Sequence, residues 1–229
     1  MPIAIVLLSG GIDSTTALYW AMKQEFTILS ITCKYPSRPA KELEAVRNIK
    51  QCAGVNCIEV ELPFLRTAAE IMKENPSLLG NAKIPEGFIP ARNTIFYSVA
   101  TYFAEIYNAS FIVAGHIETD SIGFPDATPR FFQLMEQLIN ETKLKRDNDS
   151  LNGIQLVMPF LHRTKQDVLK IGSTLGVPYE LTWSCYYDGN EPCQRCVQCS
   201  ERTDAFAKAG LKDPQLSNQP VKRMSGKES

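Results

Sequence analysis

Five short runs of apolar and β-branched residues lie along the chain, and each has the length of a buried strand. They cover residues 3–8, 27–33, 56–62, 111–114 and 155–158. Apolar residues recur at the spacing of amphipathic helices over residues 15–23, 40–53, 93–107, 129–142 and 164–176. Strands that alternate with helices predict an α/β fold, a doubly wound and mainly parallel sheet with helices on both faces.

The pattern changes after the fifth predicted helix. A loop with four cysteines follows, and a last helix is expected over residues 200–209, ended by Gly210. Beyond it almost no apolar residue remains, so burial cannot offset the entropy lost when the chain is ordered. We therefore predict an α/β domain over residues 1–180, a cysteine-containing module over residues 181–212 and a mobile tail over residues 213–229.

Composition and charge limit the kinds of function that the chain can have. The 229 residues are 44% hydrophobic and 21% charged, as in a globular protein with a sizeable core. With a formal net charge of −1, the chain lacks the positive electrostatic field that nucleic-acid binding requires. The first apolar run stops at Ser9, too short for a membrane span, and no basic segment precedes it. We expect a cytoplasmic protein that binds small molecules, without nucleic-acid or membrane partners.

A loop rich in glycine and serine follows the first predicted strand. Its sequence, Ser-Gly-Gly-Ile-Asp-Ser at residues 9–14, lies where the N–H groups of a helix N-terminus attract anions. It lacks the Gly-Lys-Ser/Thr of a Walker A loop and the third glycine of a dinucleotide fingerprint. Asp13 would repel a phosphate unless a cation lay between them, which favours a nucleotide accompanied by Mg²⁺. A tight, capped turn without a ligand is the alternative.

Four cysteines lie close together near the C-terminal end of the chain. Cys193, Cys196 and Cys199 are spaced as Cys-x-x-Cys-x-x-Cys, and Cys185 lies upstream. This spacing lets a short knuckle bind one tetrahedral zinc ion, and four sulfur ligands leave no open position, so the zinc would be structural. Disulfides and an iron–sulfur cluster are the alternatives.

The loop at residues 9–14 also resembles the pyrophosphate loop (PP-loop) of the N-type ATP pyrophosphatases. Members of that superfamily adenylate a carboxyl or carbonyl oxygen and release pyrophosphate. The resemblance implies that ATP is bound by Leu8, Ser9, Gly10, Gly11, Asp13, Ser14 and Thr15.

Three further motifs follow this loop in order. They are Pro-Ala-Arg-Asn-Thr at residues 90–94, Leu-Thr-Trp-Ser-Cys-Tyr at residues 181–186 and Pro-Cys-x-x-Cys-x-x-Cys at residues 192–199. Together they resemble the 7-cyano-7-deazaguanine (preQ0) synthase family over residues 3–214. The resemblance implies a homodimeric ATP-dependent ligase that converts 7-carboxy-7-deazaguanine and ammonia into the nitrile, in deazapurine biosynthesis of the queuosine type. The carboxylate is adenylated, ammonia gives the amide, and a second adenylation of the amide oxygen leads to the nitrile.

The same resemblance implies roles for individual residues. A carboxylate of the segment 120–126 could pair with the guanidine-like edge of the base or hold Mg²⁺. A surface ion pair is the alternative for Asp120 and Asp126, as it is for Arg92 and Lys165. Trp183 could stack on the heterocycle or belong to the core. The expected catalytic residues are Asp13, Ser14, Arg92 and Lys165. The expected substrate-binding residues are Tyr35, Arg38, Asn93, Asp120, Asp126 and Trp183, and the zinc ligands are Cys185, Cys193, Cys196 and Cys199.

Two segments depart from the family pattern. Residues 33–39 read Cys-Lys-Tyr-Pro-Ser-Arg-Pro where the family typically has Phe-Asp-Tyr-Gly-Gln-Arg-His, and residues 115–118 read Gly-His-Ile-Glu where Gly-Val-Asn is usual. A related ligase that transfers the activated carboxylate to another amine, for example on a protein, is therefore an alternative. A tRNA-modifying relative is disfavoured by the net charge, and an inactive binding protein by the intact loop with Asp13.

Overall fold

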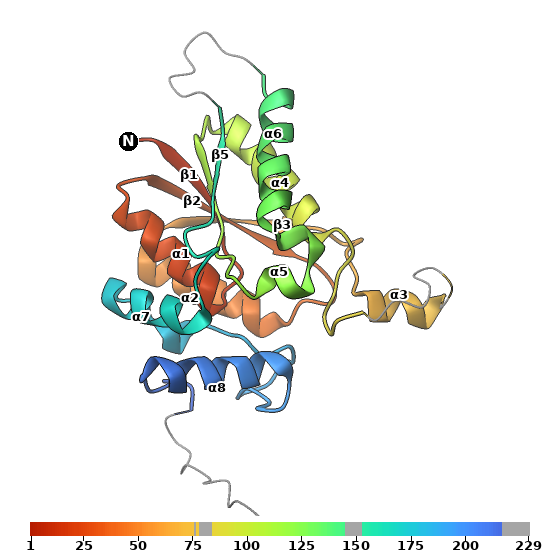
Figure 1. Ribbon diagram of the computed structural model, residues 1–229, viewed down its shortest axis with the longest axis vertical. Coiled ribbons are helices and arrows are strands. Elements are labelled where there is room, and N and C mark those ends of the chain that lie inside the picture. Colours follow the sequence, from red (N-terminus) through yellow and green to blue (C-terminus); the bar gives the residue numbers. More distant parts are fainter. Residues whose placement is uncertain (76, 78–83, 145–152, 217–229) are drawn as a thin grey trace, which may run out of the picture.

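The computed structural model describes residues 1–75, 77, 84–144 and 153–216. Five parallel strands form one sheet in the order β3-β2-β1-β4-β5 (Figure 1). The strands are β1 (Ile3–Leu7), β2 (Thr27–Lys34), β3 (Asn56–Glu61), β4 (Phe111–Val113) and β5 (Gln155–Val157). All five lie within one residue of the runs that the sequence predicts.

Helices cover both faces of this sheet. Ala4 and Val6 of β1 pack with α1, α2 and α7 on one face, whereas Ile5 packs with α4 and α6 on the other. These helices are α1 (Ile12–Lys23), α2 (Ala40–Ala53), α4 (Arg92–Ile106), α6 (Pro129–Thr142) and α7 (Lys165–Leu175). The predicted doubly wound α/β fold is confirmed.

Some elements differ from the sequence prediction. Helix α1 begins three residues earlier than the predicted residue 15, directly after Gly11, and α8 (Val197–Ala209) begins three residues before the predicted residue 200. Short elements that the sequence pattern did not reveal are α3 (Ala68–Glu74), α5 (Asp120–Gly123), and the 3₁₀ turns η1 (Pro125–Ala127) and η2 (Tyr179–Leu181). None of them is long enough to show an apolar period.

The cysteine-containing module packs under the sheet domain, with α8 against α7 (Figure 1). Cys185, Cys196 and Cys199 belong to the same buried cluster as the apolar residues of α1 and α7. Asp213, at the start of the expected tail, is buried and paired with Arg202, while residues 217–229 lie outside the described residues. Among the described residues, no helix is long and apolar enough to cross a membrane.

The strand order predicts a ligand site at the carboxyl ends of the strands. The chain adds β2 and β3 on one side of β1 and then places β4 on the other side. Open α/β sheets bind ligands at such a reversal, beyond the carboxyl ends of the strands. The loops after β1 and β4 meet there, so closely that a Cβ on Gly115 would lie 2.3 Å from the Asp13 carbonyl oxygen.

Candidate active site

A pocket of about 290 Å³ opens at the carboxyl ends of the strands. Its walls come from the loops after β1, β2 and β4, the first turns of α4 and α7, and the module that carries the four cysteines. The predicted site residues that line it are Leu8, Ser9, Gly11, Asp13, Ser14, Tyr35, Arg38, Arg92, Asn93, Asp120, Lys165 and Trp183. Gly10, Thr15 and Asp126 do not line it.

The loop after β1 is held in shape by its own side chains. The Ser14 hydroxyl lies 2.8 Å from the Ser9 hydroxyl and accepts the Ser9 N–H at 3.1 Å, and the Thr15 hydroxyl donates to the Gly11 carbonyl at 2.7 Å. No side chain caps the first turn of α1 at Gly11. The first N–H groups of α1 are thus available to an anion in the pocket, as a phosphate-binding loop requires.

Asp13 and Lys165 face each other at one end of the pocket. Their Oδ2 and Nζ atoms are 3.7 Å apart, and Lys165 Nζ lies 3.5 Å from Oε2 of Glu201 on α8. Burial raises the pKa of Asp13 to about 6, against the lowering effect of Lys165. Burial also acts to lower the pKa of Lys165, but Asp13 and Glu201 outweigh it and raise the pKa. Lys165 is therefore a permanent cation, and Glu201 is a site residue that the sequence motifs did not indicate.

One oxygen of Asp13 is left unused by the protein. Oδ1 is buried and has no hydrogen-bond partner among the described residues. A buried carboxylate oxygen without a partner is costly unless a ligand or a cation satisfies it. The donor fits a hard cation such as Mg²⁺, which prefers oxygen ligands.

Arg38 connects three elements beneath the pocket. Its side chain is almost fully buried. Four groups accept hydrogen bonds from its guanidinium: the hydroxyl of Thr32 at 2.7 Å, the carboxylate of Glu42 at 2.9 Å, and the carbonyls of Cys33 and Ser9. Most of its N–H groups are used in this way, so Arg38 holds the ends of β1, β2 and α2 together. Its contact with substrate stays a prediction.

The first turn of α4 carries Arg92 and Asn93 into the pocket. The Arg92 guanidinium lies over the Phe124 ring, 5.6 Å from its centroid. Asp126 accepts the Asn93 backbone N–H at 2.9 Å, and its carbonyl accepts from the Asn93 amide at 2.8 Å. Asp126 thus supports the helix start from behind, and its predicted contact with substrate is untested.

His116 is a pocket residue that the sequence motifs did not assign. It lies in the altered segment after β4, and its Nδ1 is 3.4 Å from Oδ2 of Asp120, which also accepts the Ile117 N–H at 3.1 Å. Tyr97, which is fully buried, lies beside the imidazole with ring centroids 6.1 Å apart. The pairing with His116 favours a hydrogen-bonding role for Asp120 over a metal-ligand role. The departure of residues 115–118 from the family pattern was the available signal.

Trp183 joins the cysteine-containing module to the loop after β1. Its backbone N–H donates to the Gly10 carbonyl at 2.9 Å. The side chain is buried and lines the pocket, and its indole N–H has no hydrogen-bond partner among the described residues. Trp183 is therefore both a core residue and an unused donor at the site.

The altered segment at residues 33–39 faces the pocket through its unaltered side chains and Cys33. Tyr35 and Arg38, which match the family pattern, line the pocket. The altered residues Lys34, Pro36, Ser37 and Pro39 do not, and Lys34 forms an exposed ion pair with Glu61 at 2.8 Å. Four of the five altered residues in this segment thus lie outside the pocket lining.

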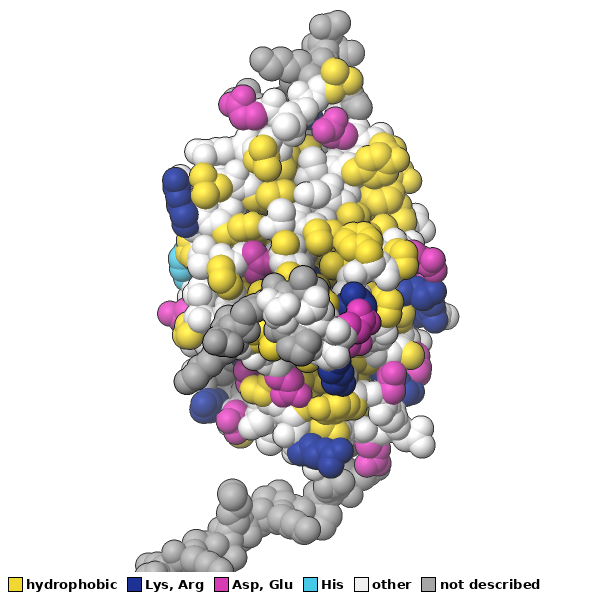
Figure 2. All heavy atoms as spheres, turned by 90° about the vertical axis from the view of Figure 1, so that its right-hand side faces the viewer, with side chains coloured by type: hydrophobic (Ala, Val, Ile, Leu, Met, Phe, Trp, Pro, Cys, Tyr) yellow, Lys and Arg dark blue, Asp and Glu magenta, His cyan; other side chains and the backbone are white. Residues whose placement is uncertain are grey.

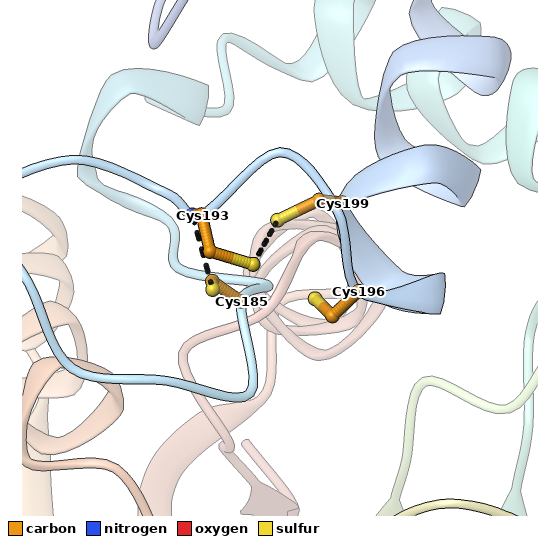
Figure 3. Close-up of side chains that lie close together, drawn as sticks. All are labelled: Cys185, Cys193, Cys196 and Cys199. Atoms are coloured by element: carbon orange, nitrogen blue, oxygen red, sulfur yellow. Dashed lines mark hydrogen bonds between the residues drawn. The ribbon is translucent and has the colours of Figure 1, made fainter.

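The four clustered cysteines meet at one point (Figure 3). Their sulfur atoms all lie within 4.8 Å of one another, with 4.0 Å between those of Cys193 and Cys199. Four thiolates bound to zinc at about 2.3 Å would be about 3.8 Å apart, so the set fits one tetrahedral ion. The backbone N–H groups of Arg195 and Cys196 lower the pKa of Cys193 to about 6, which favours the thiolate. The predicted cluster is confirmed as a group that could hold a metal ion, and its sulfur chemistry is consistent with zinc.

Comparisons with known proteins agree with this geometry. The family model described as "Queuosine biosynthesis protein QueC" matches residues 3–210. The chain is 39% identical over 217 residues to the 7-cyano-7-deazaguanine synthase of Nitratiruptor sp., covering 92% of this chain and 96% of the relative. It is 36% identical over 214 residues to the enzyme of that name from Picrophilus torridus, covering 90% and 88%.

Solved structures share the fold at lower identity. The NMN synthetase of Francisella tularensis superposes with a TM-score of 0.51 at 13% identity, covering 92% of this chain and 78% of that one. A predicted tRNA methyltransferase subunit of Methanocaldococcus jannaschii gives a TM-score of 0.51 at 18% identity, covering 76% of each chain. These likenesses support the fold alone, whereas the family model and the relatives reach further: the chain belongs to the QueC family of 7-cyano-7-deazaguanine synthases.

Proposed function

We propose that this chain is a 7-cyano-7-deazaguanine synthase, which converts 7-carboxy-7-deazaguanine, ammonia and two ATP into the nitrile preQ0, two AMP and two pyrophosphate. The observation that carries the proposal is the convergence of the loop at residues 9–14, Arg92, Lys165 and Trp183 on one pocket. Relatives that bear this enzyme name cover most of the chain. The proposed product belongs to deazapurine biosynthesis of the queuosine type, which agrees with the description of the family.

The first step activates a poor electrophile. A carboxylate resists attack by ammonia because it is negatively charged and lacks a good leaving group. Its oxygen attacks the α-phosphorus of ATP, pyrophosphate leaves, and the acyl adenylate that forms carries AMP as its leaving group. The N–H groups at the start of α1 and the cations Lys165 and Arg92 stabilise the charge that builds up on the phosphates. Ser14 shapes the loop through its bonds to Ser9.

Asp13 is suited to the Mg²⁺ that accompanies ATP. Its unpartnered Oδ1 would contact the ion, while Oδ2 faces Lys165. When bound, Mg²⁺ neutralises phosphate charge and orients the nucleotide. The positions of Asp13 and Lys165 keep one anionic and one cationic group at the same end of the pocket.

The later steps need a pocket that holds the heterocycle away from water. Trp183 and Tyr35 offer flat apolar surface, and Asn93 and Asp120 offer polar groups for the base edge. Exclusion of water allows ammonia to meet the adenylate before hydrolysis. Transfer to another amine remains the second candidate, because the altered segment at residues 115–118 places His116 in the pocket.

The cysteine-containing module forms one wall of this pocket. We propose that Cys185, Cys193, Cys196 and Cys199 hold a structural zinc ion and so fix α8, which brings Glu201 to the pocket. A reducing cytoplasm would keep these thiols available for the metal. With a net charge of −1, we expect no nucleic-acid partner.

The proposed homodimer has an apolar surface available to it. Figure 2 shows apolar side chains gathered on one face of the molecule. Exposed large apolar residues on α4 and α6 are Tyr102, Ile106, Leu134 and Leu138. Faces of this kind are typical of interaction sites. Leu138→Glu should yield a monomer in analytical ultracentrifugation where the wild type is a dimer, whereas an unchanged dimer would place the interface elsewhere.

One incubation tests the proposed reaction. The chain is mixed with ATP, Mg²⁺, ammonium and 7-carboxy-7-deazaguanine, and products are identified by mass spectrometry while pyrophosphate is measured. We expect pyrophosphate release that depends on the deazaguanine carboxylate, and a nitrile product. Formation of AMP without nitrile under excess ammonium would favour another amine acceptor. The absence of pyrophosphate with this substrate would contradict the proposal.

A further inference from the structure

The proposed reaction releases protons from nitrogen inside the pocket. Attack of ammonia on the acyl adenylate forms a C–N bond, breaks the bond from carbon to the AMP oxygen, and leaves one proton to be removed from nitrogen. On the way to the nitrile, the amide nitrogen loses its two remaining protons, one around the second adenylation and one as AMP leaves. A positioned base that accepts such protons typically accelerates a step about 10²–10⁴-fold.

Most titratable side chains of the pocket are unsuited to this task. Lys165, Arg38 and Arg92 are cations and have no lone pair to offer. Burial raises the pKa of Cys33 to about 11 and also raises the pKa values of Tyr35, Tyr97 and Tyr186, so these groups stay protonated at neutral pH.

The carboxylates of the pocket already have cationic or hydrogen-bonding partners. Glu42 binds the guanidinium of Arg38, and Glu201 faces Lys165. Asp13 faces Lys165 through Oδ2, and its unpartnered Oδ1 is the oxygen proposed above to contact Mg²⁺. Asp120 Oδ2 accepts the Ile117 N–H and faces His116. The imidazole of His116 is the remaining group that can accept a proton.

The surroundings of His116 fix both its orientation and its tautomer. The ring packs against Phe132 with centroids 4.8 Å apart and against Tyr97 at 6.1 Å. Nδ1 faces the Asp120 carboxylate at 3.4 Å, so the proton of the neutral ring resides on Nδ1 and the lone pair on Nε2. A carboxylate in this position also stabilises the imidazolium that forms when Nε2 takes up a proton.

The place of His116 in the fold brings it to the reacting atoms. It follows β4 directly, and its neighbour Gly115 packs against the backbone of Asp13 and Ser14. The substrate carbon must lie next to the α-phosphate of a nucleotide bound at residues 9–14. His116 lines that same pocket, with 16% of its side chain exposed.

We propose that His116 is a catalytic base that accepts protons from the attacking nitrogen, with Asp120 as its positioning residue. The inference rests on the proposed function and deepens it. In each proton transfer the N–H bond breaks toward Nε2 and its electron pair stays on nitrogen. AMP departs with the electrons of the C–O bond when the amide and the nitrile form, whereas pyrophosphate departs from the α-phosphorus in the second adenylation. His116 passes the proton to solvent before the next step. The role would be the same if the acceptor were another primary amine.

The test separates adenylation from nitrogen transfer. Pyrophosphate released from ATP and 7-carboxy-7-deazaguanine without ammonium reports adenylation, and amide and nitrile formed after ammonium is added report the nitrogen steps. His116→Gln should keep adenylation and slow the nitrogen steps by about 10²-fold or more. Asp13→Asn should instead lose adenylation. His162→Ala, a change at the exposed second histidine of the chain, is the matched control and should behave as the wild type.

Rescue by added imidazole distinguishes a base from a structural residue. His116→Ala leaves space between Tyr97 and Phe132 that imidazole can enter, so added imidazole should restore amide and nitrile formation. The glutamine variant fills that space and should not respond. Asp120→Asn should slow the nitrogen steps less than His116→Gln, because the base is still present. Melting temperatures of all variants are measured to show that they are folded.

Each outcome has a definite reading. Nitrogen steps in His116→Gln at the wild-type rate would overturn the inference, and so would equal loss of adenylation and nitrogen transfer in that variant. A folded His116→Ala that imidazole fails to rescue would also overturn it. If the wild type releases no pyrophosphate with 7-carboxy-7-deazaguanine, the proposed function fails and the inference falls with it.

Discussion

At the scale of single residues, the backbone of Gly10 determines the shape of the loop after β1. Its φ is 89°, and a Cβ at this position would lie 2.7 Å from the Glu42 carbonyl oxygen. An alanine would meet both a strained backbone and a clash with α2 that no side-chain rotation can relieve. The loop can therefore approach α2 only because residue 10 is glycine.

Gly10→Ala should abolish ATP binding and lower the melting temperature. The matched control is Gly54→Ala, since Gly54 also has a positive φ, 67°, but nothing lies within 4 Å of its added Cβ. The control carries backbone strain alone, about 1–2 kcal/mol, and should bind ATP normally. Calorimetric titration with ATP and thermal melts measure both effects, and equal behaviour of the two variants would contradict this role for Gly10.

Asp13→Asn should stabilise the chain in the absence of nucleotide while it removes activity. The pKa of Asp13 is raised from 3.8 to about 6, so the folded state binds more protons than the unfolded state between these values. Stability therefore falls as pH rises through this window, and the whole penalty is present at pH 7. Removing the charge should gain about 1–3 kcal/mol at pH 7. Melting curves at pH 4 and pH 7 test this, and a variant less stable than the wild type at pH 7 would refute it.

At the scale of elements, the sequence pattern predicts best where local signals agree. The predicted range 40–53 is the range of α2, because Pro39 precedes the helix and Gly54 ends it with a left-handed backbone. Helix α1 begins earlier than predicted because the loop of residues 9–14 continues into the helix without a side-chain cap. The seven residues of α3 have a capping box at Thr67 and Glu70, which is a local signal for the start of a helix.

Some residues of the candidate site are likewise predicted by local motifs, and others are not. Residues 9–14 and the four cysteines are local motifs and were found from spacing alone. Glu201 and His116 reach the pocket only because α8 packs under α7 and because β4 lies beside β1. The burial of Arg38 depends on acceptors from three elements. Such contacts arise from tertiary packing, which a linear pattern does not contain.

Cys196→Ser should release the metal and loosen α8. Cys196 is both a member of the cluster and the N-cap residue of α8. Because a tetrathiolate zinc site contributes directly to folding, the melting temperature and the activity should both fall. Elemental analysis should find one zinc per wild-type chain. Cys52→Ser, at an exposed cysteine outside the cluster, should change neither value, and iron with labile sulfide would refute the assignment.

At the scale of the whole molecule, a buried ion pair ties the last described residues to the active site. Arg202 donates to both carboxylate oxygens of Asp213, at 2.7 and 2.9 Å, and each side chain is 4% exposed. It also donates to the Thr182 hydroxyl at 2.8 Å and to the Tyr179 carbonyl at 3.1 Å. Trp183, which follows Thr182 in the chain, donates its backbone N–H to the Gly10 carbonyl. The cysteine-containing module and the loop after β1 are thus joined through residues 182 and 183, which are hydrogen-bonded to Arg202 and to Gly10 respectively.

Arg202→Met should destabilise the chain by about 3–5 kcal/mol, because Asp213 would be left as an uncompensated buried charge. The KM for ATP should rise with it, since the segment that carries Trp183 loses its support. Arg47→Met breaks an exposed pair with Glu59 and should cost about 1 kcal/mol or less. Urea denaturation compares the two variants. Equal losses would mean that the Arg202 pair adds no more than a surface contact.

The hydrogen bond from the Trp183 N–H to the Gly10 carbonyl has a consequence for when the site can form during protein synthesis. The loop at residues 9–14 leaves the ribosome first, and the wall formed by Trp183, Tyr186 and Glu201 emerges about 170 to 190 residues later. Domains tend to assemble from the N-terminus as they are made. The sheet can therefore begin to form while the nucleotide site is still open on one side. A nascent chain that ends before α8 is expected to be unable to retain ATP, so we expect carboxylate activation only after α8 has been made and packed.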